Sequence, residues 1–165
     1  MLALFKDLTI SQYKAALLTL GNCIDECPED LWFGKIANHS FNVSAFHAIF
    51  FADVYLGKSL AELKAQDFHN RYAADFDGYE ELSNDPPVNI YRKAFVKEYL
   101  DFCHSKAVFV VANETAESLK RQSAIPWQKL TRAELHVYNI RHIQHHAAQL
   151  VLRLRLDSDV DIDWL

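Results

Sequence analysis

The chain has 165 residues with a formal net charge of −5 at pH 7, and half of its residues are hydrophobic. This length suits one domain over residues 1–165 that is large enough to bury a core. Four glycines and four prolines are too few for the many turns of an all-β protein, so the composition favours an all-α fold. The negative charge, with no run of Lys or Arg longer than two, argues against nucleic acid as a partner.

The sequence also predicts a cytoplasmic protein without a membrane partner. Its first residues lack the basic segment and long apolar segment of a signal peptide. No uninterrupted apolar stretch reaches the roughly 18 residues of a membrane span. The three cysteines, an odd number, indicate free thiols rather than a disulfide framework. Cys23 and Cys27 are four residues apart, but we interpret them, with Cys103, as small core residues.

In chain order, the first predicted helix covers residues 9–26, with Thr9 or Ser11 as its cap. Its apolar positions repeat at helical spacing and are Tyr13, Ala16, Leu17, Leu20, Ile24 and Cys27. A second helix is predicted over residues 36–56, ending at Gly57. Both segments have the apolar stripe expected of helices that pack into a bundle.

Residues 58–87 interrupt the helical pattern. Ser59 caps a short predicted helix over residues 59–66, and residues 67–85 are polar, aromatic and irregular. A connection of this length is unusual between antiparallel neighbours and favours a crossover between two parallel helices. Four aromatic residues of the segment are expected to be buried against the bundle: Phe68, Tyr72, Phe76 and Tyr79.

The third long helix is predicted over residues 88–112, followed by a short one over residues 115–121. Thr131 and Glu134 form the capping-box pattern that starts the fourth, which runs to residue 156. After it, the acidic tail contains Trp164, which indicates that the tail docks on the bundle. The sequence therefore predicts a four-helix bundle with one long crossover between its second and third long helices.

Three of the eight histidines lie within five residues of the last helix, at His142, His145 and His146. Residues three and four apart share one helical face, so His142 can share a metal ion with either His145 or His146. The third ligand is expected from the second helix, at His47. Three histidines from two helices, with an open position for water or substrate, are typical of a catalytic metal site.

Other assignments follow from position along the helices. Asp53 lies about 120° from His47, so its carboxylate is expected to pair elsewhere. His136 lies on the other side of the last helix from His142 and is predicted to be at the surface, whereas His104 on the third helix could approach the site. Arg153, near the end of the last helix, is expected to face solvent.

No Glu-x-x-His pair of a di-iron bundle and no His-Glu-x-x-His protease motif occurs.

Two motifs resemble those of the DinB/YfiT-like superfamily. The first is Ser-x-x-His-x-x-x-x-x-Asp, from Ser44 to Asp53, and the second is His-x-x-His-His-x-x-Gln-Leu, from His142 to Leu150. The resemblance implies helices in up-down-down-up order and a homodimer. It also implies a divalent metal, zinc or nickel, on His47, His142 and His146. His145 and Gln149 would then support the ligands or line the pocket.

The resemblance further implies an activity. Characterised members of this superfamily are thiol transferases that use bacillithiol, mycothiol or glutathione, or isomerases dependent on such thiols. The expected function is therefore a metal-dependent, thiol-dependent S-transferase or a related hydrolase, with a low-molecular-weight thiol as a second cofactor. The alternative is a non-catalytic, metal-binding or stress-response dimer in which the metal only secures the helices. No catalytic residue beyond the metal ligands is predicted.

Overall fold

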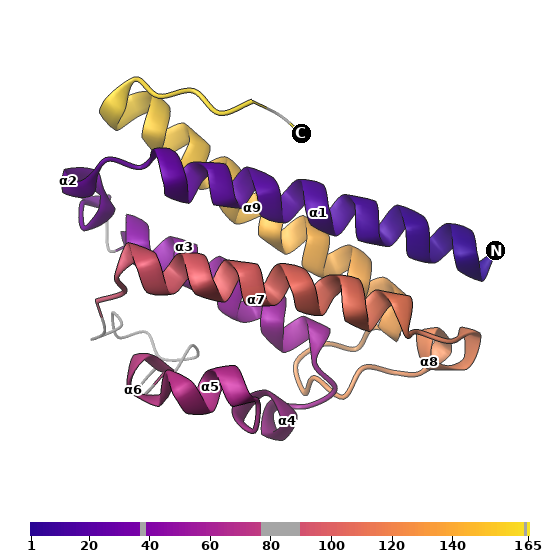
Figure 1. Cartoon of the computed structure of the whole chain (residues 1–165). Helices are drawn as coiled ribbons and strands as arrows, with labels where there is room; N and C mark the ends of the chain where they lie inside the picture. The colour runs from indigo at the N-terminus through magenta and orange to yellow at the C-terminus, as the bar shows by residue number, and fades with distance from the viewer. Residues whose placement is uncertain (37–38, 77–89, 164) are drawn as a thin grey trace.

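The computed structural model describes residues 1–36, 39–76, 90–163 and 165. Within them, four long helices pack side by side in a bundle (Figure 1). These are α1 (Leu2–Glu26), α3 (Phe41–Leu56), α7 (Lys93–Ala112) and α9 (Arg132–Ser158). The short elements are α2 (Glu29–Trp32), β1 (Lys35–Ile36), β2 (His39–Ser40), α4 (Leu60–Lys64), α5 (Asp67–Arg71), α6 (Ala73–Phe76) and α8 (Ala116–Lys120). The predicted all-α, four-helix fold is confirmed.

The order of the four helices is up-down-down-up. In Figure 1, α1 and α9 run in one direction, and α3 and α7 run in the opposite direction. Both α1 and α3 pack against α7 and against α9. Hence α1 lies diagonally opposite α3, and α7 lies diagonally opposite α9. The parallel pair α3 and α7 requires the long connection that the sequence predicted.

That connection carries α4, α5 and α6, which lie below α3 and α7 in Figure 1. Phe68 of α5 is buried, and its ring stacks on Phe102 and Tyr99 of α7 at centroid distances of 4.7 and 5.2 Å. The expected burial of Phe68 is thus confirmed, while Tyr72 and Phe76 are half-buried. Tyr79, like Trp164 in the tail, lies outside the described residues.

The cap residues act as their sequence pattern indicates. The backbone N–H of Thr131 donates to the Glu134 carboxylate at 2.8 Å, and Thr131 Oγ1 accepts from the Glu134 N–H at 3.3 Å. This capping box begins α9. Ser59 likewise caps α4 through the N–H of Glu62, at 3.1 Å. Such bonds satisfy amide groups that the first turn of a helix leaves unpaired.

Three helix starts differ from the prediction. α1 begins at Leu2 rather than at residue 9, because Thr9 is a buried residue inside the helix instead of its cap. α3 begins only at Phe41, because residues 35–36 and 39–40 pair as two short antiparallel strands. α7 begins at Lys93, after an Arg92 with extended backbone, rather than at residue 88.

Aromatic side chains occupy much of the core between the helices. The Phe46 ring stacks on Tyr91 at 3.8 Å, and the indole N–H of Trp32 donates to the Tyr91 carbonyl at 2.8 Å. The ring stacking holds α3, and the hydrogen bond holds α2, against the segment that leads into α7. Within the described residues, no helix has the length and apolar character needed to cross a lipid bilayer.

Two arginines of α9 hold the two ends of α3. Arg132 donates to the carbonyls of Leu56 and Gly57, at 2.7 and 3.1 Å, where α3 ends. Arg153 donates to the Gly34 carbonyl at 2.9 Å, shortly before α3 begins. The solvent-facing position predicted for Arg153 is therefore wrong: its side chain is buried, with only 9% exposed, and its guanidinium binds this loop carbonyl.

Candidate metal centre

Three histidine side chains converge where α3 packs against α9. His47 projects from α3, while His142 and His146 lie one turn apart on α9. One ring nitrogen from each lies within 4.8 Å of those of the other two. Nitrogens that share a tetrahedral ion lie roughly 3.3 Å apart, given Zn–N bonds of about 2.1 Å. A small closing movement of the side chains would therefore let this group hold a metal ion.

Ring packing fixes the orientation of the three imidazoles. The His146 ring lies 4.6 Å from His47 and 4.6 Å from His142, measured between centroids. Phe51, one turn after His47 on α3, packs against His47 at 4.9 Å and against His142 at 5.4 Å. The Tyr55 ring meets His142 edge-on at 5.8 Å. These aromatic rings form an apolar wall on one side of the group and shield it from water.

The same burial keeps the imidazoles neutral. Burial, with a smaller effect of the neighbouring histidines, lowers the pKa of His47 to about 4 and that of His142 to about 3. Burial also lowers the pKa of His146 to about 4, against a hydrogen bond to Gln149 that raises it. At neutral pH all three are therefore unprotonated, which is the form that binds transition metals.

One nitrogen of the group is left unsatisfied in the absence of a metal. His142 Nδ1 is buried and has no hydrogen-bond partner among the described residues. An unsatisfied buried polar atom costs about 1–3 kcal/mol of stability. A metal ion coordinated by His142 would give this ring a polar partner, so the residues present fit a metal ligand set.

Gln149 defines the tautomer of His146. Its side-chain oxygen, which can only accept, lies 3.0 Å from His146 Nδ1, so that nitrogen carries the proton and Nε2 is left for a metal. The Gln149 amide N–H donates to His145 Nε2 at 3.1 Å. His145 is exposed and outside the three-histidine group. The structure thus brings together His142 and His146, an alternative that helical spacing left open.

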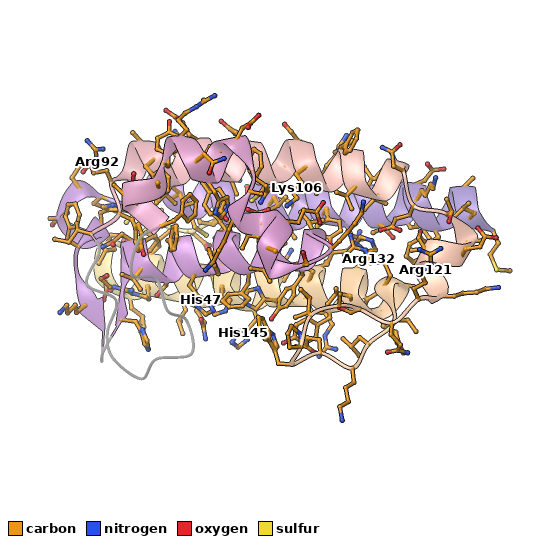
Figure 2. The ribbon with its side chains drawn as sticks, turned by 90° about the horizontal axis from the view of Figure 1, so that it is seen from below. His47, Arg92, Lys106, Arg121, Arg132 and His145 are labelled. Carbon is orange, nitrogen blue, oxygen red and sulfur yellow. The ribbon has the colours of Figure 1, made fainter. Side chains whose placement is uncertain are left out.

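The site has an open side on α9. A surface pocket of about 450 Å³ borders His142 and is also lined by Tyr138, Arg141, Gln144 and His145. Figure 2 shows His47 and His145 along this side of the α3–α9 pair. Three ligands with space beside them resemble a catalytic metal site more than a closed structural one. The sequence identified the histidines but did not predict the pocket, whose only sequence signal was that Arg141 follows Tyr138 by three residues and precedes His145 by four on one helix.

The remaining histidines lie elsewhere. His104 is on α7, diagonally opposite α9, and does not join the three-histidine group. His136 is buried, so its predicted surface position is wrong: α1 covers the face of α9 that points away from α3. The His136 ring lies between Tyr13 and Glu114, at 3.1 Å from the hydroxyl of one and from the carboxylate of the other. Glu114 also accepts from Arg132 at 2.7 Å.

Asp53 pairs away from the site, as its helical position predicted. Its buried carboxylate accepts hydrogen bonds from His69 Nε2 and the Tyr99 hydroxyl, both at 2.8 Å, and from the Lys106 ammonium group. Burial alone would raise the pKa of Asp53, but these bonds and the Lys106 charge hold it below its ordinary value. The network joins α3 to α5 of the crossover and to α7.

The three cysteines take no part in the site. Cys23, Cys27 and Cys103 are buried free thiols. Burial raises the pKa of Cys23 to about 12 and that of Cys27 to about 11, so both remain protonated at neutral pH. Their assignment as core residues agrees with this environment, because a reactive or metal-binding cysteine needs a thiolate.

Models of known protein families, the sequences of curated proteins and solved structures were compared with the chain, and none of them matches. The structure itself shows an all-helical bundle with a group of three histidines that could hold a metal ion.

Proposed function

We propose that the chain is a one-domain, DinB-like metalloprotein of the cytoplasm in which His47, His142 and His146 bind one divalent ion, zinc or nickel. The convergence of three neutral imidazoles from two helices carries this proposal. The pKa values of about 3 to 4 support it, because protons do not compete with a metal for these nitrogens at neutral pH. The DinB-like motifs of α3 and α9 supply the same three ligands.

The activity we propose is thiol-dependent S-transfer or a related hydrolysis. A divalent ion bound here would lower the pKa of a thiol or water and favour its anionic form near neutral pH. Gln149 holds His146 in the tautomer that leaves Nε2 for the ion. Phe51 and Tyr55 exclude water on one side, and the pocket beside His142 gives a substrate access on the other. That open side favours the enzyme over the non-catalytic dimer.

Metal content per chain tests the metal site directly. Untagged protein is expected to contain close to one equivalent of zinc or nickel by inductively coupled plasma mass spectrometry. His47→Ala, His142→Ala and His146→Ala should each lose it, because two imidazoles retain a divalent ion poorly. His145→Ala is the matched control: it removes an exposed neighbouring histidine outside the group and should keep the metal.

Two outcomes would overturn the proposal at different levels. Wild-type protein that takes up no metal, even after reconstitution, would refute the metal site. Metal-loaded protein that transfers no thiol to a chromogenic electrophile, with bacillithiol, mycothiol or glutathione as donor, would instead support the non-catalytic alternative.

The homodimer is a further proposal, and the exposed face of α1 is the surface we assign to it. Leu4, Leu8 and Leu18 are each more than half exposed. Together with Ala15 they follow the heptad spacing of a helix that packs against another helix. We expect wild-type protein to sediment as a dimer and Leu8→Lys to shift it to the monomer, since a buried lysine would lack a partner. A wild-type protein that is monomeric at roughly 50–100 µM would refute the dimer.

A further inference from the structure

Helix α9 gives His142 two possible metal-binding partners, and the three-histidine group uses only one of them. His146, one turn further along the helix, belongs to the group, whereas His145 does not. His145 follows His142 by three residues, so these two side chains also lie near one face of the helix. Both of them line the surface pocket of about 450 Å³. A second pair of histidines is therefore placed at the open side of the site.

His145 is close to the inner ligands but differs from them in exposure. Its side chain is exposed, while the three histidines of the group are half-buried. The ring centroids of His145 and His146 lie 5.1 Å apart, and a charge on His145 acts on both His142 and His146. The Gln149 amide binds His145 and His146 at 3.1 and 3.0 Å. The exposed ring is thus held beside the buried ones.

The surroundings of the group restrict how a hydrated ion can reach it. Phe51 and Tyr55 pack against the imidazoles on one side, and the pocket beside His142 lies on the open side. A divalent ion that loses water without gaining a ligand is strongly destabilised, because it leaves a high dielectric uncompensated. An exposed imidazole in the pocket avoids this state, since it replaces one water molecule while the ion still retains others.

We propose that His145 is the entry ligand of the metal site: a divalent ion first binds His145 and His142 in the pocket and then moves to the three-histidine group. This inference rests on the proposed function and adds the route by which its metal is loaded. His142 belongs to both sets, so the ion stays bound to it while His146 and His47 replace His145 and the remaining water. A ligand used only in transit lowers the barrier to entry and to release equally, which leaves the equilibrium affinity unchanged.

Uptake of cobalt(II) by the metal-free protein tests this route. The visible absorption of bound cobalt(II) is followed after rapid mixing, and its release is followed in excess chelator. In His145→Gln we expect uptake and release both to be slower by about ten-fold, the effect of losing one weak contact at the barrier. The stoichiometry and the equilibrium dissociation constant should match those of the wild type. His145→Cys should restore rapid uptake, because a thiol is another metal-binding side chain.

His104→Gln is the matched control, since it removes a half-buried histidine of α7 that lies outside the three-histidine group. It should take up cobalt(II) at the wild-type rate. Uptake by His145→Gln that is as fast as in the wild type would overturn the assignment. Weaker equilibrium binding with an unchanged uptake rate would overturn it too, because His145 would then support the bound state. Failure of the proposed function is recognised separately, since the wild type would then bind no cobalt(II) at all.

Discussion

Replacing Asp53 with alanine is expected to lower the free energy of unfolding by about 3–5 kcal/mol, the range for removing one partner of a buried ion pair. The substitution leaves the Lys106 ammonium group, the His69 ring and the Tyr99 hydroxyl without their shared acceptor. None of the three can turn to bulk water easily, because Tyr99 and His69 are buried and Lys106 is only 15% exposed. Urea unfolding at pH 7, followed by circular dichroism, measures the change.

Asp101→Ala serves as the control for this loss. Asp101 is an exposed carboxylate on α7, the helix that supplies Tyr99 and Lys106, and its removal should cost less than about 0.5 kcal/mol. If Asp53→Ala lowered the free energy of unfolding by as little as the control, the network would not contribute to stability as we infer.

Because His69 and Gln66 belong to the crossover, we also expect faster hydrogen exchange in α4 and α5 of Asp53→Ala.

The metal-free protein should lose several kcal/mol of stability on acidification from pH 6.5 to pH 4. In the unfolded chain the three site histidines titrate near 6.5, but in the folded protein the pKa of His47 is about 4 and that of His142 about 3. Between these values the unfolded state binds more protons, so stability falls as pH decreases. His47 alone accounts for about 3 kcal/mol, at 1.36 kcal/mol per pKa unit.

Urea unfolding at half-unit steps of pH gives the slope, and His142→Gln is the informative variant. Glutamine does not titrate, so this variant should show a shallower dependence between pH 4 and 6.5. The pKa of Glu114 is lowered from 4.5 to about 2, so its contribution to stability is lost as the pH falls from 4.5 to about 2, and the steps from pH 6.5 to 5 report the histidines. A wild-type stability that is flat from pH 6.5 to 4 would contradict the burial we assign to the three imidazoles.

The fold was largely predictable because its signals are local. Helical apolar spacing and the caps at Ser59 and Thr131 located the helices, and the length of residues 58–87 predicted the parallel pair α3 and α7. The errors arose where tertiary contacts override local preference. Thr9 has the chemistry of a cap, yet burial against the bundle extends α1 through it to Leu2.

The site was predictable in part for a similar reason. The spacing of His142, His145 and His146 placed them near one face of a helix but left His145 and His146 as alternatives. The resemblance favoured His146, and the packing of α3 on α9 brings this residue next to His47. The burial of His136 depends on α1, a contact that no spacing within α9 reveals. The partners of Asp53 come from α5 and α7, so its network could not be deduced from α3 alone. The metal, its ligands and the activity remain predictions.

The arginines at the two ends of α3 have a consequence for redesign of the site. Arg132 and Arg153 set the register between α3 and α9, and this register determines how far His47 lies from His142 and His146. Metal preference depends on the geometry of the donor atoms as well as on their type. Directed evolution toward a different metal should therefore accumulate substitutions around these distant carbonyl contacts, with all three histidines retained. Ion choice would then be tuned from the ends of a helix, well away from the donor atoms themselves.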